Sequence, residues 1–146
     1  VNDVSGSIGY DVAKYGDIIV GSFGNAKPLC LGHGGFLAYD DSMFDYVENF
    51  GLDHENLCQL LENLSLKQEK FKKMHDELVE QFAGSEIIHP GCTGINVIVK
   101  YKDDAEKERI ARWLRGAGFE YTECPRYIRV NEKALSVEVK RLFKQN

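Results

Sequence analysis

Residues 16–41, GDIIVGSFGNAKPLCLGHGGFLAYDD, carry the most specific pattern in this sequence. Two short apolar runs within it, residues 17–23 and 34–39, are bounded by glycines and aspartates, which is typical of buried strands. A loop of mostly small residues joins the two runs and contains Lys27. Because both runs are almost continuously apolar, we expect them to belong to a parallel sheet that is buried on both faces.

The beginning of the chain suggests part of a larger domain. The first residue is Val1 rather than methionine, and eight of the 14 glycines lie at or before Gly35. We therefore interpret the chain as a fragment, in which residues 1–52 are the remnant of a layered α/β domain. Asp40, Asp41 and Ser42 are typical N-cap residues, and they predict a short helix with apolar residues at 43, 44, 47 and 50.

Length and composition exclude several classes of protein. The 146 residues suffice for one hydrophobic core, and the net charge of −5 argues against nucleic acid or an anionic membrane as the main partner. No apolar run reaches the roughly 18 residues of a membrane span. The four cysteines form no C-x-x-C pair, so we expect neither a metal site nor a disulfide scaffold, and we expect a cytoplasmic protein with reduced thiols.

The middle of the chain predicts a long helix over residues 53–82, or two helices that break near Ser65. Apolar residues recur at helical spacing, and we interpret their stripe as core packing. These residues are Leu57, Leu61, Leu64, Phe71, Met74, Leu78 and Phe82. Lysines and glutamates cover the other face, and residues 67–73 are interpreted as solvated helix surface.

The last third predicts a small α+β domain with a mainly antiparallel sheet and helices on one face. Apolar residues alternate from Ile95 to Tyr101, as in a strand, and Asp103 and Asp104 then cap a helix that ends near Gly116 and Gly118. The Asp103-Asp104 pair and residues 106–109 are interpreted as solvated helix surface. Short strands are expected at residues 119–122 and 127–130. A closing helix is expected from Asn131, with Leu135, Val139, Leu142 and Phe143 inward. The second domain would thus cover residues 53–146.

Lys27 is the residue most suited to chemistry. It follows a predicted strand and precedes a glycine loop, where desolvation favours the neutral, nucleophilic amine. The loop at residues 32–35 matches neither the dinucleotide-binding nor the P-loop spacing. Taken alone, most such lysines are solvated surface charges, and this is the alternative for Lys27.

Several elements occur together in a known order: Asp3, the strand at residues 17–23 with its Ser22-Phe23 pair, Lys27, the glycine pair at 34–35 and the Asp40-Asp41 pair. In this order they resemble the cofactor-lysine region of fold-type I pyridoxal-phosphate-dependent aminotransferases. The DegT-like, sugar-aminotransferase branch is the most similar. The resemblance covers about the first 41 residues, and the rest of the chain agrees with the family's C-terminal domain in architecture only.

The resemblance implies a role for each matching residue. Lys27 would form the internal aldimine with pyridoxal 5′-phosphate and later move the proton between the substrate Cα and the cofactor. Asp3 would bind the pyridine nitrogen, and Ser22 would bind the cofactor phosphate. Two structural alternatives stay open: Asp3 could be a turn residue, and Ser22 could be a strand serine that bonds to backbone.

The sequence also departs from the family pattern. His33 stands where the pattern has glutamate, and the aromatic residue and main phosphate-binding turn of the family would lie upstream of Val1. Residues 127–131 resemble the strand on which amino-acid aminotransferases carry the arginine that binds the substrate carboxylate, which makes Arg129 the candidate substrate-binding residue. An exposed sheet arginine is the alternative for Arg129.

The expected function is therefore transamination of an amino acid or amino sugar, with pyridoxal phosphate as cofactor and an amino donor and a keto acceptor as substrates. The resemblance also implies a homodimer, and as a fragment the chain is expected to be inactive by itself. A decarboxylase or lyase with the same lysine chemistry is one alternative, because Lys27 and Asp3 would serve all these reactions. A non-catalytic α+β module for ligand binding or oligomerisation is the other.

Overall fold

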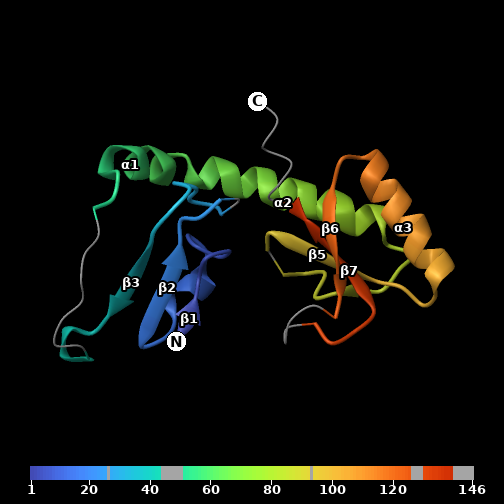
Figure 1. The fold of residues 1–146 in the computed structure, drawn as a ribbon, viewed down its shortest axis with the longest axis horizontal. Coiled ribbons are helices and arrows are strands. Elements are labelled where there is room, and N and C mark those ends of the chain that lie inside the picture. Colours follow the sequence, from blue (N-terminus) through green and yellow to red (C-terminus); the bar gives the residue numbers. More distant parts are fainter. Residues whose placement is uncertain (26, 44–50, 93, 126–129, 140–146) are drawn as a thin grey trace. The chain divides into compact units, whose positions relative to one another are not determined.

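The computed structural model describes residues 1–25, 27–43, 51–92, 94–125 and 130–139. The chain divides into two compact units, Val1–Glu69 and Lys70–Asn146 (Figure 1), and each is described below by itself. The sequence placed the division between residues 52 and 53. In the structure it falls inside a helix, between Glu69 and Lys70.

The first unit contains a three-stranded sheet. Strand β1 (Asn2–Asp3) is parallel to β2 (Ile18–Ser22), and β2 is antiparallel to β3 (Gly35–Tyr39), so that the order is β1-β2-β3. The two strands expected at 17–23 and 34–39 are thus confirmed. The expectation that the two strands belong to a parallel sheet is wrong for this pair, because β2 and β3 pair antiparallel.

Two glycines allow β2 and β3 to approach closely. A Cβ atom on Gly35 would lie 2.3 Å from the backbone oxygen of Gly21, and a Cβ on Gly21 would lie 2.2 Å from the ring of Phe36. That ring packs against Phe23, with ring centroids 5.7 Å apart. Gly21 inside β2 and Gly35 at the start of β3 are therefore required by packing within the sheet.

Two short 3₁₀ helices, an α-helix and the beginning of a second α-helix, up to Glu69, complete the first unit. The 3₁₀ helices are η1 (Asp11–Lys14) and η2 (Asp41–Met43), and residues 44–50 of the expected short helix lie outside the described residues. The long helical stretch is two helices, α1 (His54–Glu62) and α2 (Leu64–Gln81), with the break at Asn63. The side chain of Asp53 caps α1. Leu64 packs with Phe23 and Leu29 in the core of this unit.

The second unit contains a four-stranded antiparallel sheet in the order β4-β5-β7-β6. Its strands are β4 (Ile87–Ile88), β5 (Asn96–Lys100), β6 (Glu120–Cys124) and β7 (Ala134–Glu138), and helix α3 (Asp104–Gly116) lies between β5 and β6 in sequence. Asp103 caps α3 as expected, and Gly118 follows the helix with φ +77°. The small α+β domain with an antiparallel sheet is thus confirmed.

The core of this unit lies between the sheet and its helices. Alternate residues of β5 and β7 point to one face and are almost completely buried. They cluster with buried residues of α2 and α3, so that both helices cover the same face. The cluster includes Phe71 and Leu78 of α2, Val97 and Val99 of β5, Ile110 and Leu114 of α3, and Leu135 and Val137 of β7.

The prediction of a closing helix from Asn131 is wrong for the residues that the structure describes, which end at 139. Residues Ala134–Glu138 form β7, which lies between β5 and β6 in the sheet. Leu135 and Val139 are four residues apart, a spacing that fits a helix, but it is also two periods of a strand, and Val137 completes the alternation. Positions 142 and 143 and most of the strand expected at 127–130 lie outside the described residues.

No helix in the described part of the chain is both long and apolar enough to cross a membrane.

Candidate functional site

The candidate site lies at the edge of the first sheet where β1 and β2 end. Because the two strands are parallel, their carboxyl ends lie at the same edge, and the residues that follow them come together there. Asp3 ends β1 and Ser22 ends β2. The loop after β2 then leads to Lys27. The three residues implied by the resemblance thus share one edge of the sheet.

A chain of hydrogen bonds connects these three residues. The Oδ1 atom of Asp3 accepts from the amide of Ser5 at 3.0 Å, and the hydroxyl oxygen of Ser5 accepts from the amide of Ser22 at 2.9 Å. The hydroxyl oxygen of Ser22 accepts from the amide of Gly24 at 3.1 Å. Finally, the carbonyl of Gly24 accepts from the amide of Lys27 at 3.3 Å. Asp3 and Lys27 therefore belong to one continuous piece of hydrogen-bonded structure.

These contacts match the structural alternatives for Asp3 and Ser22. The exposed carboxylate of Asp3 supports a turn through the Ser5 amide, and the half-buried hydroxyl of Ser22 bonds to backbone. Each contact uses one lone pair, and a carboxylate or hydroxyl oxygen can accept from more than one donor. The structural contacts and a ligand-binding role are therefore compatible.

The Lys27 segment is held from helix α2. The ammonium group of Lys67 donates to the carbonyl oxygens of Pro28 at 2.8 Å and of Lys27 at 3.3 Å. Burial lowers the pKa of Lys67 below its ordinary value, while the neighbouring Cys30 acts on it in the opposite direction. Lys67 was interpreted from the sequence as solvated surface. That interpretation is wrong, because its side chain is half-buried against these backbone carbonyls.

The glycine loop after Lys27 folds back onto the end of β2. The amides of Leu31 and Gly32 donate to the carbonyl of Phe23, and the amide of Phe23 donates to the carbonyl of Gly34. Gly32 and Gly34 have φ values of +86° and +76°, which side chains rarely adopt. His33 between them is exposed. The glycines thus shape the loop that carries Lys27.

Arg129, the candidate substrate-binding residue, lies outside the described residues. Sequence reasoning missed two residues that build the site, Ser5 and Lys67. Ser5 follows Asp3 at the spacing of an Asx turn, and this spacing could have indicated it. Lys67 has no such signal, because its partners are backbone carbonyls some 40 residues away in sequence.

A cavity of about 550 Å³ lies at the other end of the same sheet. Asp17, before β2, and Tyr39 and Asp40, at the end of β3, contribute to its lining. Since β2 runs from this end toward Ser22, the cavity and Lys27 lie at opposite ends of the sheet. This cavity therefore does not belong to the site.

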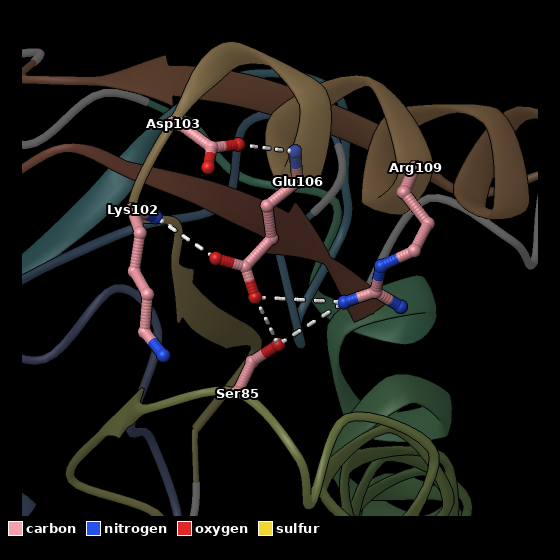
Figure 2. A network of polar contacts seen from close by, with 5 residues as sticks. All are labelled: Ser85, Lys102, Asp103, Glu106 and Arg109. Atoms are coloured by element: carbon pink, nitrogen blue, oxygen red, sulfur yellow. Dashed lines mark hydrogen bonds and ion pairs between the residues drawn. The ribbon is translucent and has the colours of Figure 1, made fainter.

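A second polar cluster, in the second unit, caps helix α3 (Figure 2). Asp103 accepts from the amide of Glu106, and the carboxylate of Glu106 accepts from the amide of Lys102 at 2.9 Å and from the hydroxyl of Ser85 at 3.2 Å. Arg109 lies 3.5 Å from the same carboxylate. The Glu106 side chain is only 19% exposed, which corrects its interpretation as solvated surface. These groups bond to one another and form a structural network, a variant of the capping box in which the carboxylate of Glu106 accepts from the amide of the residue before the N-cap.

No group of histidine, cysteine, aspartate or glutamate side chains in the described ranges could hold a metal ion.

Comparison with known proteins places the chain in a family. A family model described as the MJ1341 family C-terminal domain matches residues 62–146. The chain belongs to the MJ1341 family. The part that matches the MJ1341 C-terminal domain begins at the end of α1 and includes α2 and the second unit, whereas Asp3, Ser22 and Lys27 precede it. No curated protein and no solved structure matches the chain.

Proposed function

We propose that this chain is the C-terminal part of a pyridoxal-phosphate-dependent aminotransferase, which transfers an amino group between an amino acid or amino sugar and a keto acceptor. The observation that carries the proposal is the hydrogen-bonded edge on which Asp3, Ser22 and Lys27 lie together. The resemblance of the first 41 residues to the cofactor-lysine region supplies the chemistry. In this proposal the first unit is the end of the large cofactor-binding domain.

The residues at the edge fit the groups of the cofactor. An amine is needed for its aldehyde, a carboxylate for its ring nitrogen and a hydroxyl donor for its phosphate, and Lys27, Asp3 and Ser22 provide one of each. When bound, pyridoxal phosphate supplies an electron-accepting ring that stabilises negative charge at the substrate Cα.

Each of the four candidate site residues would then have a defined task. The amine of Lys27 would hold the cofactor covalently and, once released by the substrate, would move the proton at the substrate Cα. Asp3 would keep a proton on the ring nitrogen by its negative charge. The hydroxyl group of Ser22 would donate a hydrogen bond to the phosphate, while its oxygen still accepts the hydrogen bond from the Gly24 amide. Arg129 would bind the substrate carboxylate through two parallel hydrogen bonds.

Two alternatives differ from this proposal in what they require. A decarboxylase or lyase would use Lys27 and Asp3 in the same way but would break another bond of the substrate, so that release of CO₂ or of a leaving group identifies it. A non-catalytic ligand-binding or oligomerisation module would need none of these residues.

We propose a cytoplasmic homodimer as the working form of the enzyme.

The test is to identify the lysine that binds the cofactor. The full-length protein is incubated with pyridoxal phosphate, reduced with borohydride, digested and mapped by mass spectrometry. We expect a stoichiometric tag on Lys27 and none on the exposed Lys70, and we expect the variant Lys27→Arg to lose the tag. A tag spread over exposed lysines, with the same yield in Lys27→Arg, would contradict the proposal.

A further inference from the structure

Helix α2 holds both loops that form the candidate site. Lys67 bonds to the carbonyls of Lys27 and Pro28 in the loop after β2. The next residue, Gln68, donates its amide to the carbonyl of Ile8, in the loop after β1, at 2.8 Å. The two loops carry Lys27 and the Asp3 turn, respectively. Consecutive side chains of one helix thus fasten the two sides of the site.

The contact made by Lys67 is unusual for a lysine. Lysine side chains normally extend into water, and their long, flexible stems lose freedom when they are fixed. Here the ammonium group is half-buried, and the carbonyls of Lys27 and Pro28 accept from it beside the buried residues Pro28 and Leu29. Buried carbonyls need donors, and a charged donor makes the stronger hydrogen bond.

We propose that Lys67 is a positioning residue for Lys27: its ammonium group fixes the Lys27–Pro28 backbone so that the Lys27 amine is held at the Asp3–Ser22 edge. This inference rests on the proposed function, because it assigns Lys67 a task in presenting the cofactor lysine. Lys67 acts on this segment through backbone carbonyls, and the carbonyl that it binds at 3.3 Å belongs to Lys27 itself. Reaction rates depend steeply on such placement, since a displacement of about 1 Å can cost about a hundredfold.

The burial of Lys67 supports this assignment. Its lowered pKa reflects an ammonium group that has exchanged water for protein surroundings. Lys70, three positions later on α2, gives the contrast, because its side chain is exposed. Substitution of Lys70 therefore provides a matched control on the same helix.

The first readout needs no cofactor. In Lys67→Met, which keeps the aliphatic stem but has no donor, we expect backbone amides of residues 23–32 to exchange hydrogen about tenfold faster, because a charge-assisted hydrogen bond has been lost. These amides include those of Leu31 and Gly32, which close the loop onto Phe23. Exchange in β5 and β7 should stay unchanged. Lys67→Arg should restore slow exchange, since a guanidinium can also donate to two carbonyls. Lys70→Met should behave like the unaltered protein.

The second readout separates positioning from simple loop stability. The rate at which pyridoxal phosphate and borohydride tag Lys27 in the full-length protein should fall about tenfold in Lys67→Met and recover in Lys67→Arg. If Lys67→Met fails to fold by circular dichroism, Lys67→Gln, which keeps one donor group, takes its place.

The outcomes are distinguishable. Unchanged exchange at residues 23–32 in Lys67→Met would overturn the inference, because Lys67 would not hold the segment. Faster exchange with an unchanged tagging rate would also overturn it, since Lys67 would then stabilise the loop without positioning Lys27. If the unaltered protein carries no tag on Lys27, the proposed function fails, and the positioning role fails with it.

Discussion

The backbone amide of Ser22 donates to the hydroxyl oxygen of Ser5 at 2.9 Å, across the carboxyl ends of β1 and β2. This contact joins the turn that contains Asp3 to the strand that leads to Lys27. It also brings together residues that lie 17 positions apart in sequence. The candidate site thus depends on the parallel pairing of β1 and β2, although β1 has only two residues. This pairing places the backbone and side-chain groups of the site at one edge of the sheet.

Replacement of Asp3 by asparagine separates its structural and chemical roles. The asparagine oxygen can still accept from the Ser5 amide, so that the turn should persist, whereas the negative charge is lost. In the full-length enzyme we expect turnover to fall by several orders of magnitude while the tag on Lys27 still forms, because about 1.4 kcal/mol of lost transition-state stabilisation is tenfold in rate. Steady-state kinetics and peptide mapping measure the two effects. Near-normal turnover would mean that Asp3 is only a turn residue.

Gly35→Ala should destabilise the first sheet. The added methyl group would lie 2.3 Å from the backbone oxygen of Gly21, which cannot move without breaking the pairing of β2 and β3. We expect a loss of about 1–3 kcal/mol in the free energy of opening of this sheet, as for other overpacked positions. Hydrogen exchange at the amides of β2 and β3 measures it.

Gly84→Ala is the matched control for this substitution. A Cβ atom at Gly84 would meet nothing within 4 Å. We expect its effect on the free energy of unfolding to stay within about 0.5 kcal/mol. Equal effects of the two substitutions would contradict the role of the close approach between β2 and β3.

The parts of the fold that follow from the sequence are those with local signals. Helix α3 has an aspartate cap, an apolar face and a glycine after its end, so that its bounds could be predicted almost to the residue. Strand β7 could not, because Leu135 and Val139 satisfy a helical and a strand period at once. Only the pairing of β7 with both β5 and β6, which is a tertiary effect, decides between them. Strand β4 has two residues and is too short for any periodic pattern.

The candidate site, like the fold, could be predicted from the sequence only in part. A motif resemblance indicated Asp3, Ser22 and Lys27, and the structure brings the three to one edge. The resemblance concerned side chains and so carried no information on Lys67, whose partners are backbone carbonyls. In a helix face rich in lysine, nothing local distinguishes the half-buried Lys67 from the exposed Lys70. Contacts of this kind become visible only when the tertiary structure is known.

The capping network of α3 predicts a dependence of stability on pH. Hydrogen bonds, first of all from the Lys102 amide, lower the pKa of Glu106 below its ordinary value of 4.5. A lowered carboxyl pKa in the folded state stabilises the fold above pH 4.5, and this contribution is lost as the pH falls through the folded-state pKa. Glu106→Gln should therefore cost about 1 kcal/mol at pH 7 and less at pH 3, which lies below 4.5.

The single tryptophan, Trp113 on α3, provides the measurement for Glu106→Gln. Urea unfolding is followed by Trp113 fluorescence at both pH values, with the exposed Glu108 changed to glutamine as the control. A difference between the Glu106 variant and the unaltered protein that is as large at pH 3 as at pH 7 would show that the charge of Glu106 contributes nothing.

In the isolated 146-residue chain, the second unit should be far more stable than the first. Its core cluster holds twelve buried hydrophobic residues among those described, whereas the cluster of the first unit holds three. Apolar burial is the main stabilising term, and β3 leaves Leu37 39% exposed. We therefore expect hydrogen exchange to show strong protection in β5 and β7 and weak protection in β2 and β3. Lys27 and Asp3 lie on the weaker unit, so the isolated chain should retain no stoichiometric pyridoxal phosphate after dialysis and should not catalyse transamination. Equal protection of both sheets, in a chain that stays yellow after dialysis and is active, would show that the first unit is stable by itself.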